Sequence, residues 1–113
     1  MRGIVFGNTF ENAKKKFMDI VSKYELMRIA VEKPLTKTKY ELRSYFTNGD
    51  FWSAIAVDNC RPGRRCHIAY IDDEINPHVV DTVIKPCLTA SPYCAYNYFH
   101  IWTEEELDEF LAN

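Results

Sequence analysis

The sequence predicts an α/β fold in which a mixed β-sheet is flanked by helices. With 113 residues, the chain is long enough for one modest hydrophobic core. Hydrophobic residues make up 47% of it, which indicates a globular fold rather than a disordered chain. Short apolar segments of strand length are interleaved with amphipathic segments of helical period. We therefore expect residues 1–113 to form a single small α/β domain.

The N-terminal third is predicted to form a strand, a helix and a second strand. Residues 3–6 are apolar and indicate a buried strand, and Thr9 is expected to cap the helix that follows. Residues 26–31 are again apolar and predict a strand, which a right-handed crossover would place parallel to the first. The residues expected on the buried side of the helix recur at helical spacing: Ala13, Phe17, Ile20, Val21 and Tyr24.

The middle of the chain predicts a β-hairpin. Residues 40–46 and 51–57 read as strands, and Asn48-Gly49 lies between them. This dipeptide is typical of a tight hairpin turn in which both central positions need positive φ. If the hairpin lies at the edge of the sheet, strand addition there could form a homodimer, which is one hypothesis for a partner.

The last part of the chain predicts two strands and two helices. Residues 66–71 form an apolar strand, and Asn76-Pro77 is expected to begin a helix that Pro86 stops or kinks. Residues 94–102 are rich in aromatic side chains and predict a final strand. Thr103 is expected to cap a final helix.

Two clusters of polar residues flank the strand at residues 66–71. The acids that follow it are Asp72, Asp73 and Glu74, and the loop before it carries Arg61, Arg64 and Arg65. A buried strand ending in acids is how P-loop ATPases place a magnesium ligand and a catalytic carboxylate. No Gly-Lys-Ser/Thr occurs in the chain, so the lysine and backbone nest that hold phosphates are missing.

The order of these motifs resembles the ATPase core of phage large-terminase subunits and related helicase-type P-loop proteins. In that family a strand and a Thr-containing turn lead into a helix, as residues 5–13 do here, and an Asn-Gly hairpin comes later. An Arg-Gly-Arg loop then precedes the Walker B strand, as residues 61–65 precede residues 68–73. The resemblance covers roughly residues 3–88 and implies a P-loop-like topology. Because Walker A is absent, it implies a truncated or degenerate core whose acids are positions without a working catalytic pair.

Each polar cluster has a functional and a structural interpretation. Asp72, Asp73 and Glu74 could bind magnesium for nuclease chemistry, or they could be solvated acids that favour the dipole of the next helix. The arginines of residues 61–65 could contact nucleic-acid phosphates, or they could pair with nearby acids.

The aromatic residues near the C-terminus also have two interpretations. They could contact a protein partner or stack on bases, or they could belong to the core. The residues proposed for partner contact are Tyr93, Tyr96, Tyr98 and Trp102.

Composition excludes several classes of protein. A net charge of -2 argues against a general nucleic-acid binder, and no apolar run is long enough to span a membrane. The N-terminus does not look like a signal peptide, so we expect the cytoplasm of a bacterial host. The four cysteines do not have zinc-site spacing and are expected to be reduced thiols.

The leading hypothesis is a non-catalytic accessory protein of a phage or mobile element that binds another protein. An inhibitor of a host defence or replication system is one example, and it needs no cofactor. The alternative is a nucleic-acid- or nucleotide-associated protein that uses residues 61–65 and the acids of residues 72–74, with magnesium as a candidate cofactor.

Overall fold

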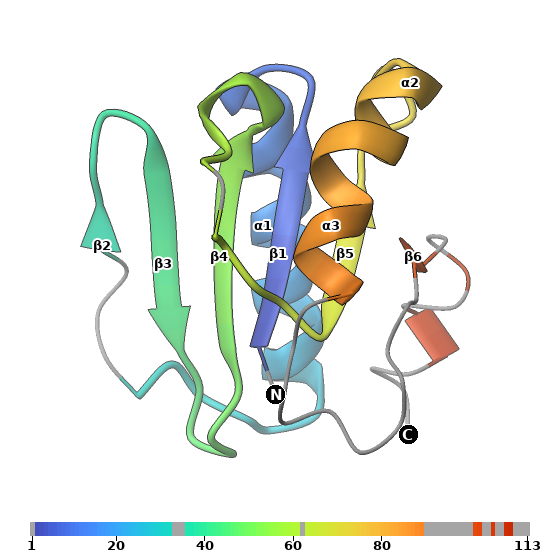
Figure 1. The fold of residues 1–113 in the computed structure, drawn as a ribbon. Coiled ribbons are helices and arrows are strands. Elements are labelled where there is room, and N and C mark those ends of the chain that lie inside the picture. The colour runs from blue at the N-terminus through green and yellow to red at the C-terminus, as the bar shows by residue number, and fades with distance from the viewer. Residues whose placement is uncertain are drawn as a thin grey trace.

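The computed structural model describes residues 2–32, 36–61, 63–89 and 101–102, together with 105, 108 and 109. A mixed sheet of order β2-β3-β4-β1-β5-β6 forms the centre of the fold, with helices on both faces (Figure 1). The strands are β1 (Arg2–Gly7), β2 (Thr36–Lys37), β3 (Glu41–Tyr45), β4 (Phe51–Ala56), β5 (Ile68–Ile71) and β6 (Ile101–Trp102). The helices are α1 (Phe10–Leu26), α2 (Pro77–Val79) and α3 (Lys85–Thr89), with a π-helical turn over Val80–Ile84 and a 3-10 turn over Val57–Asn59. The predicted α/β class with a mixed sheet is confirmed.

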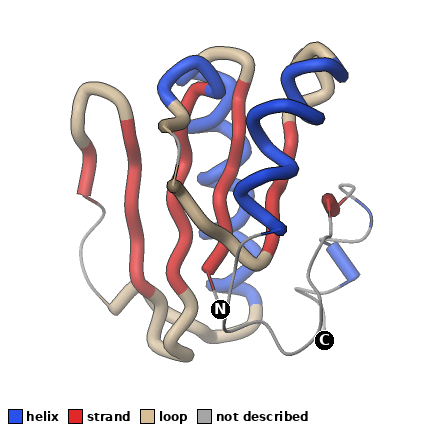
Figure 2. Tube along the Cα trace, viewed as in Figure 1, coloured by secondary structure: helices blue, strands red, loops and turns tan. Residues whose placement is uncertain are grey.

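Strand β1 is central and parallel to both of its neighbours, β4 and β5. Strand β3 is antiparallel to β4, and β2 is antiparallel to β3. Figure 2 shows α1 behind the sheet, and the helical segment of α2 and α3 in front of β1 and β5. Since side chains alternate between the two faces of a strand, the sheet has two separate cores.

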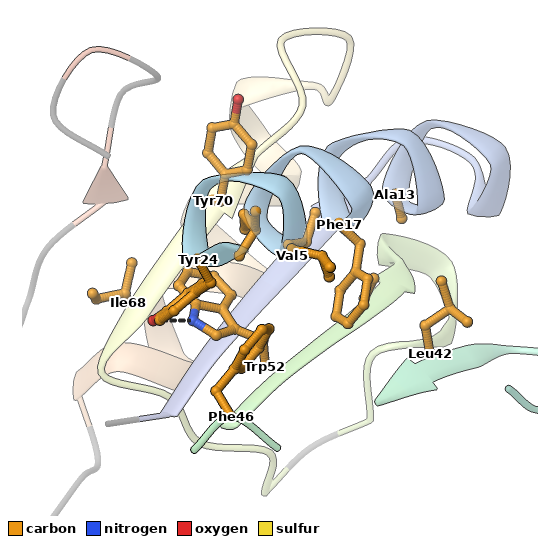
Figure 3. Packing of buried hydrophobic residues seen from close by; sticks show 12 residues of the cluster. Val5, Ala13, Phe17, Tyr24, Leu42, Phe46, Trp52, Ile68 and Tyr70 are labelled. Atoms are coloured by element: carbon orange, nitrogen blue, oxygen red, sulfur yellow. Dashed lines mark hydrogen bonds between the residues drawn. The ribbon is translucent and has the colours of Figure 1, made fainter. Parts of the chain in front are cut away.

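Helix α1 has the predicted cap and the predicted buried side. The hydroxyl of Thr9 accepts a hydrogen bond from the backbone N–H of Asn12 at 3.2 Å. All five residues expected on the buried side are buried. In Figure 3 the hydroxyl of Tyr24 accepts a hydrogen bond from Nε1 of Trp52, at 3.0 Å, and the ring of Tyr24 stacks on Phe46 with centroids 4.2 Å apart.

The predicted strand at residues 26–31 is wrong. Helix α1 continues to Leu26, and Arg28 then adopts a φ of 61° while the N–H of Ile29 donates to the carbonyl of Tyr24. These features form a Schellman-type helix end. Within this stretch Val31 makes an isolated antiparallel bridge to Phe46, and the apolar side chains pack against the α1 core instead of joining β1. The parallel neighbours of β1 come from later in the chain.

The predicted hairpin is confirmed, but its turn differs from the expected one. Gly49 has a φ of 92°, and no positive φ occurs at Asn48. The N–H of Gly49 donates to the carbonyl of Phe46, and the N–H of Phe46 donates to the carbonyl of Asp50. This is a type I turn with a G1 bulge, in which glycine alone takes the left-handed conformation. Because β2 lies outside β3, the hairpin is not the outermost part of the described sheet.

The helix after β5 begins as predicted and ends later than predicted. Asn76 caps it, since its side chain accepts from the N–H of His78, and Pro77 is at its start. Pro86, predicted to stop or kink the helix near Lys85, does not stop it, because α3 runs on to Thr89. The N–H of Lys85 donates to the carbonyl of Val80, five residues back. Just before Pro86 the helix thus changes from i→i−4 to i→i−5 hydrogen bonds. Pro86 has no N–H to donate, so this is also the point at which the regular α-helical pattern would lose a bond.

The predictions for the C-terminal region are tested only in part. Of the strand expected at residues 94–102, Ile101 and Trp102 form β6, parallel to β5. The other residues of that strand and the cap at Thr103 lie outside the described residues.

Candidate functional site

Asp72 lies at the end of β5, where β1 leads into α1. Its Oδ2 accepts hydrogen bonds from the backbone N–H of Asn8, at 3.0 Å, and from Nδ2 of Asn12, at 2.8 Å. Its Oδ1 accepts from the backbone N–H of Glu74 at 3.2 Å. The residue is 6% exposed. The carboxylate therefore joins the end of β5 to the start of α1.

The electrostatics around Asp72 favour its charged form. Burial alone would raise the pKa of the Asp72 carboxyl, but the N–H groups of Asn8, Asn12 and Glu74 outweigh burial and hold this pKa below its usual value. The negative charge also lies near the positive end of the α1 dipole.

The other two predicted acids differ from Asp72 in exposure and in hydrogen-bond partners. Asp73 and Glu74 are exposed, and Oε2 of Glu74 accepts from Nδ2 of Asn12 at 2.9 Å. Asn12 thereby bridges two of the three predicted acids. Within the described residues, no group of three or more His, Cys, Asp or Glu side chains is placed to hold a metal ion.

The loop that carries Arg61, Arg64 and Arg65, called the arginine loop below, contacts the sheet at Glu41. Nη1 of Arg64 lies 2.6 Å from Oε1 of Glu41, and Nη2 of Arg43 lies 2.8 Å from Oε2 of the same carboxylate. Burial raises the pKa of the Glu41 carboxyl, but the two arginines more than offset this and lower it overall. Nη1 of Arg65 donates to the carbonyl of Arg64, whereas Arg61 is exposed. The three predicted arginines therefore have different roles in the structure.

Glu41 is a site residue that sequence reasoning did not identify. An acid at the start of an alternating strand is expected to face solvent, and nothing in the local pattern marks its burial. Its partner Arg64 is 23 residues away in the chain. Residues 57–61 and 63–67 cross in front of the sheet in Figure 1, and this crossing brings Arg64 to Glu41.

One part of the sheet has aromatic and cationic side chains that are exposed or half-buried. We call it the open face and define it as Arg2, Arg43, Tyr45 and Phe51. The rings of Tyr45 and Phe51 are neighbours on paired strands, with centroids 4.6 Å apart. The guanidinium carbon of Arg2 lies 5.8 Å from the centroid of Phe51. Tyr45 is 45% exposed, and the side chain of Arg43 is 53% exposed.

The open face is on the side of the sheet that carries α2 and α3. Strand residues whose side chains point to this side include Ile4 and Ile55, which belong to the core under the helices. Among the described segments in Figure 1, these helices lie in front of β1 and β5 and leave β3 uncovered. With respect to the described helices, the open face is thus an uncovered continuation of the packed sheet surface.

The predicted aromatic contact residues are not part of the described site. Tyr93, Tyr96 and Tyr98 lie outside the described residues, and for Trp102 the structure describes the backbone position in β6. Their role as partner contacts stays a prediction.

Comparison with protein-family models, with curated proteins and with solved structures found no match. In the described part of the chain, no helix combines the length and apolar character that crossing a membrane requires.

Proposed function

We propose that this protein is a non-catalytic accessory protein that binds another protein through its open face. The observation that supports this most directly is the pair of exposed Tyr45 and half-buried Phe51, flanked by Arg2 and Arg43 on a sheet surface that the described helices leave uncovered. Tyrosine and arginine are the residue types in which binding energy concentrates at protein interfaces. A protein of a phage or mobile element that inhibits a host defence or replication system, in the cytoplasm of a bacterial host, fits this proposal.

Charge supports an acidic partner surface. The chain carries a net charge of -2, yet two of the four open-face residues are arginines, and the neighbouring Glu41 is already paired with Arg43. Arg43 uses one guanidinium nitrogen on Glu41, and its half-exposed side chain has further donors. A partner surface with carboxylates around an apolar or aromatic anchor would complement these groups.

The arrangement at the carboxyl edge supports the absence of catalysis. The Asp72 carboxylate accepts three N–H donors and has low exposure, so it is bound within the protein rather than presented to a substrate. We propose that Asp72 stabilises the fold and that the protein needs no cofactor.

The test compares two exposed tyrosines of the same hairpin. Tyr45 is 45% exposed on the open face, and Tyr40 is 53% exposed outside it, just before β3. The tagged wild type, Tyr45→Ala and Tyr40→Ala are used to capture proteins from a nuclease-treated bacterial lysate. A protein retained by wild type and Tyr40→Ala but lost with Tyr45→Ala is then purified, and its affinity is measured by calorimetry. We expect Tyr45→Ala to weaken binding at least about 30-fold, since an anchoring aromatic contributes about 2 kcal/mol or more.

Equal capture by all three forms would rule out the open face as the docking surface. Size-exclusion chromatography with light scattering on the same three forms tests the homodimer hypothesis. A dimer lost with Tyr45→Ala would identify a second copy of the chain as the occupant of the open face.

The second candidate is a nucleic-acid-associated protein. Its supporting observation is that Glu41 binds both Arg43 of the open face and Arg64 of the arginine loop. Through Glu41 the cationic loop is thus connected to the strand that carries Tyr45, whose ring and that of Phe51 could stack on bases of a single strand. Fluorescence anisotropy with a labelled single-stranded oligonucleotide, measured across salt concentrations, tests this candidate. Binding that falls steeply with salt, and with both Tyr45→Ala and Arg64→Ala, would favour it over a protein partner.

A further inference from the structure

Two cysteine thiols face each other between the arginine loop and α3. Sγ of Cys60 and Sγ of Cys87 lie 3.8 Å apart. Cys60 follows the 3-10 turn and is half-buried, whereas Cys87 is in α3 and is 4% exposed. A disulfide needs a sulfur–sulfur distance of about 2.05 Å, so the two atoms must approach by roughly 1.8 Å.

The two chain segments differ in how firmly they are held. The carbonyl of Cys87 accepts from the backbone N–H of Cys66, at 3.2 Å, and its Sγ contacts the carbonyl of Val83. Cys60 lies where the 3-10 turn opens into the loop, and its N–H donates to the carbonyl of Val57. Closing the gap therefore requires a movement of the Cys60 side chain towards a fixed Cys87.

The surroundings make the thiols chemically unequal. A hydrogen bond from Cys60, opposed by burial and aided by the charges of Arg65 and Arg64, lowers the pKa of the Cys87 thiol to about 7. The sulfur–sulfur contact allows either thiol to donate, and Cys60 donates when Cys87 is ionised; this hydrogen bond, together with burial, raises the pKa of Cys60. Cys66 is nearby but differs, because burial and the neighbouring Cys87 raise its pKa to about 12. Cys87 is thus the more nucleophilic thiol, and Cys60 is placed to attack the Cys87 sulfur once that sulfur is oxidised.

We propose that Cys60 and Cys87 form a peroxide-reactive dithiol, with Cys87 as the nucleophile and Cys60 as the resolving thiol. The Cys87 thiolate attacks one oxygen of a hydroperoxide, the O–O bond breaks, and hydroxide leaves and takes up the proton lost by Cys87 as water. The Cys60 sulfur then attacks Sγ of Cys87, the S–O bond breaks, and the departing hydroxide takes the Cys60 proton as a second water. Two thiols lose two electrons in total, and hydrogen peroxide is reduced to two waters.

The burial of Cys87 selects the class of oxidant. A hydroperoxide as small as water can reach a sulfur that is nearly enclosed, whereas a bulky disulfide such as oxidised glutathione needs in-line access to the attacking sulfur. The bond would also attach the arginine loop covalently to α3, across a loop of 27 residues. This inference is independent of the proposed binding function, since none of the open-face residues takes part in it.

The experiment uses the reduced full-length chain and hydrogen peroxide. The expected product has lost two hydrogen atoms by intact mass, and peptide mapping finds Cys60 joined to Cys87. Cleavage before Asp81 separates Cys66 from Cys87, and chymotryptic cleavage after Tyr93 separates Cys87 from Cys94, which lies outside the described residues. Between pH 6 and pH 8 the rate of Cys87 oxidation should rise roughly 10-fold and level off, with its midpoint near the Cys87 pKa.

Matched variants separate the two roles. Cys66→Ser and Cys94→Ser should form the bond as the wild type does. Cys60→Ser should stop with Cys87 as a sulfenic acid, which dimedone traps, and Cys87→Ser should not form the intramolecular bond. Mapping in the wild type needs no variant, so a variant that fails to fold leaves the test intact.

Three results would overturn the proposal. The first is a wild type that forms no 60–87 bond with peroxide while its thiols are consumed elsewhere. The second is a bond that joins Cys66 or Cys94 instead. The third is faster formation of a glutathione mixed disulfide at Cys87 from oxidised glutathione than of the internal bond from peroxide.

Discussion

Replacing Asp72 with asparagine tests the central structural assignment, that this carboxylate stabilises the fold. Asp72→Asn keeps the size of the side chain and removes its charge. One acceptor oxygen is replaced by an NH2 group, which must then face an N–H donor, either that of Glu74 or those of Asn8 and Asn12. The geometry of the donors leaves no rotamer of asparagine that satisfies all three.

The cost follows from these three hydrogen bonds. In the better orientation the bond from Glu74 is lost, and the two remaining bonds change from charge-assisted to neutral. A hydrogen bond to a charged group contributes roughly 1.5–3 kcal/mol and a neutral one roughly 0.5–1.5 kcal/mol. Allowing for the smaller desolvation cost of a neutral side chain, we expect unfolding free energy to fall by about 2–3 kcal/mol. For a domain of this size that corresponds to a Tm lower by roughly 10 °C.

Urea unfolding at pH 7, followed by tryptophan fluorescence, measures this loss. Asp73→Asn is the matched control, since Asp73 is the exposed neighbour, and we expect it to change stability by less than about 0.5 kcal/mol. Asp72 has a lowered pKa in the folded state, so its contribution is fully present above its unfolded pKa of about 3.9 and is lost as pH falls through the folded value. The difference between wild type and Asp72→Asn should therefore shrink on acidification.

Two outcomes would refute the reasoning. Equal stability of Asp72→Asn and Asp73→Asn would show that the three hydrogen bonds contribute nothing measurable. A Tm that rises with millimolar magnesium in the wild type, but not in Asp72→Asn, would show that the carboxylate is a metal ligand, as the metal hypothesis requires.

Three further substitutions test the packing and the ion pairs by urea unfolding. Gly3→Ala places a Cβ 2.5 Å from ring atoms of Trp52, so overpacking should cost about 1–3 kcal/mol, and a neutral effect would show that the ring can move freely. Tyr24→Phe removes the hydroxyl that donates to Asp50 at 2.6 Å and accepts from Trp52, with an expected loss of about 1–3 kcal/mol; an unchanged midpoint would contradict that role. Glu41→Gln weakens the pairing with its two arginines and should cost about 1–2 kcal/mol at low salt and less at high salt, so a loss independent of salt would argue against an electrostatic cause.

Helix α1 and the hairpin were predictable because their signals are local. The cap at Thr9 and the spacing of the apolar residues lie within a few turns of the helix they define, so distant parts of the chain do not alter them. Gly49 likewise permits the turn by its own conformational freedom, although the bulged turn type depends on how the two strands twist together.

Residues 26–31 show where local pattern fails. An apolar segment of this length suits a strand, but a strand forms only where an edge of the sheet is open to it. Both edges of β1 are occupied by β4 and β5, which come later in the chain. After α1 ends at Arg28, this segment instead runs beside the hairpin, where Val31 forms a bridge with Phe46.

The residue types at the candidate sites could be predicted from the sequence, but the contacts between those residues could not. The sequence by itself determined the α/β class, the buried side of α1, the hairpin and the acid at the end of β5, because propensity, periodicity and capping act over neighbouring residues. The tertiary structure alone decided the strand order, the three donors around Asp72, the pairing of Glu41 with Arg64 and the approach of Cys60 to Cys87. Those contacts join residues distant in the chain, and they exist only where the packing of both sheet faces brings the segments together.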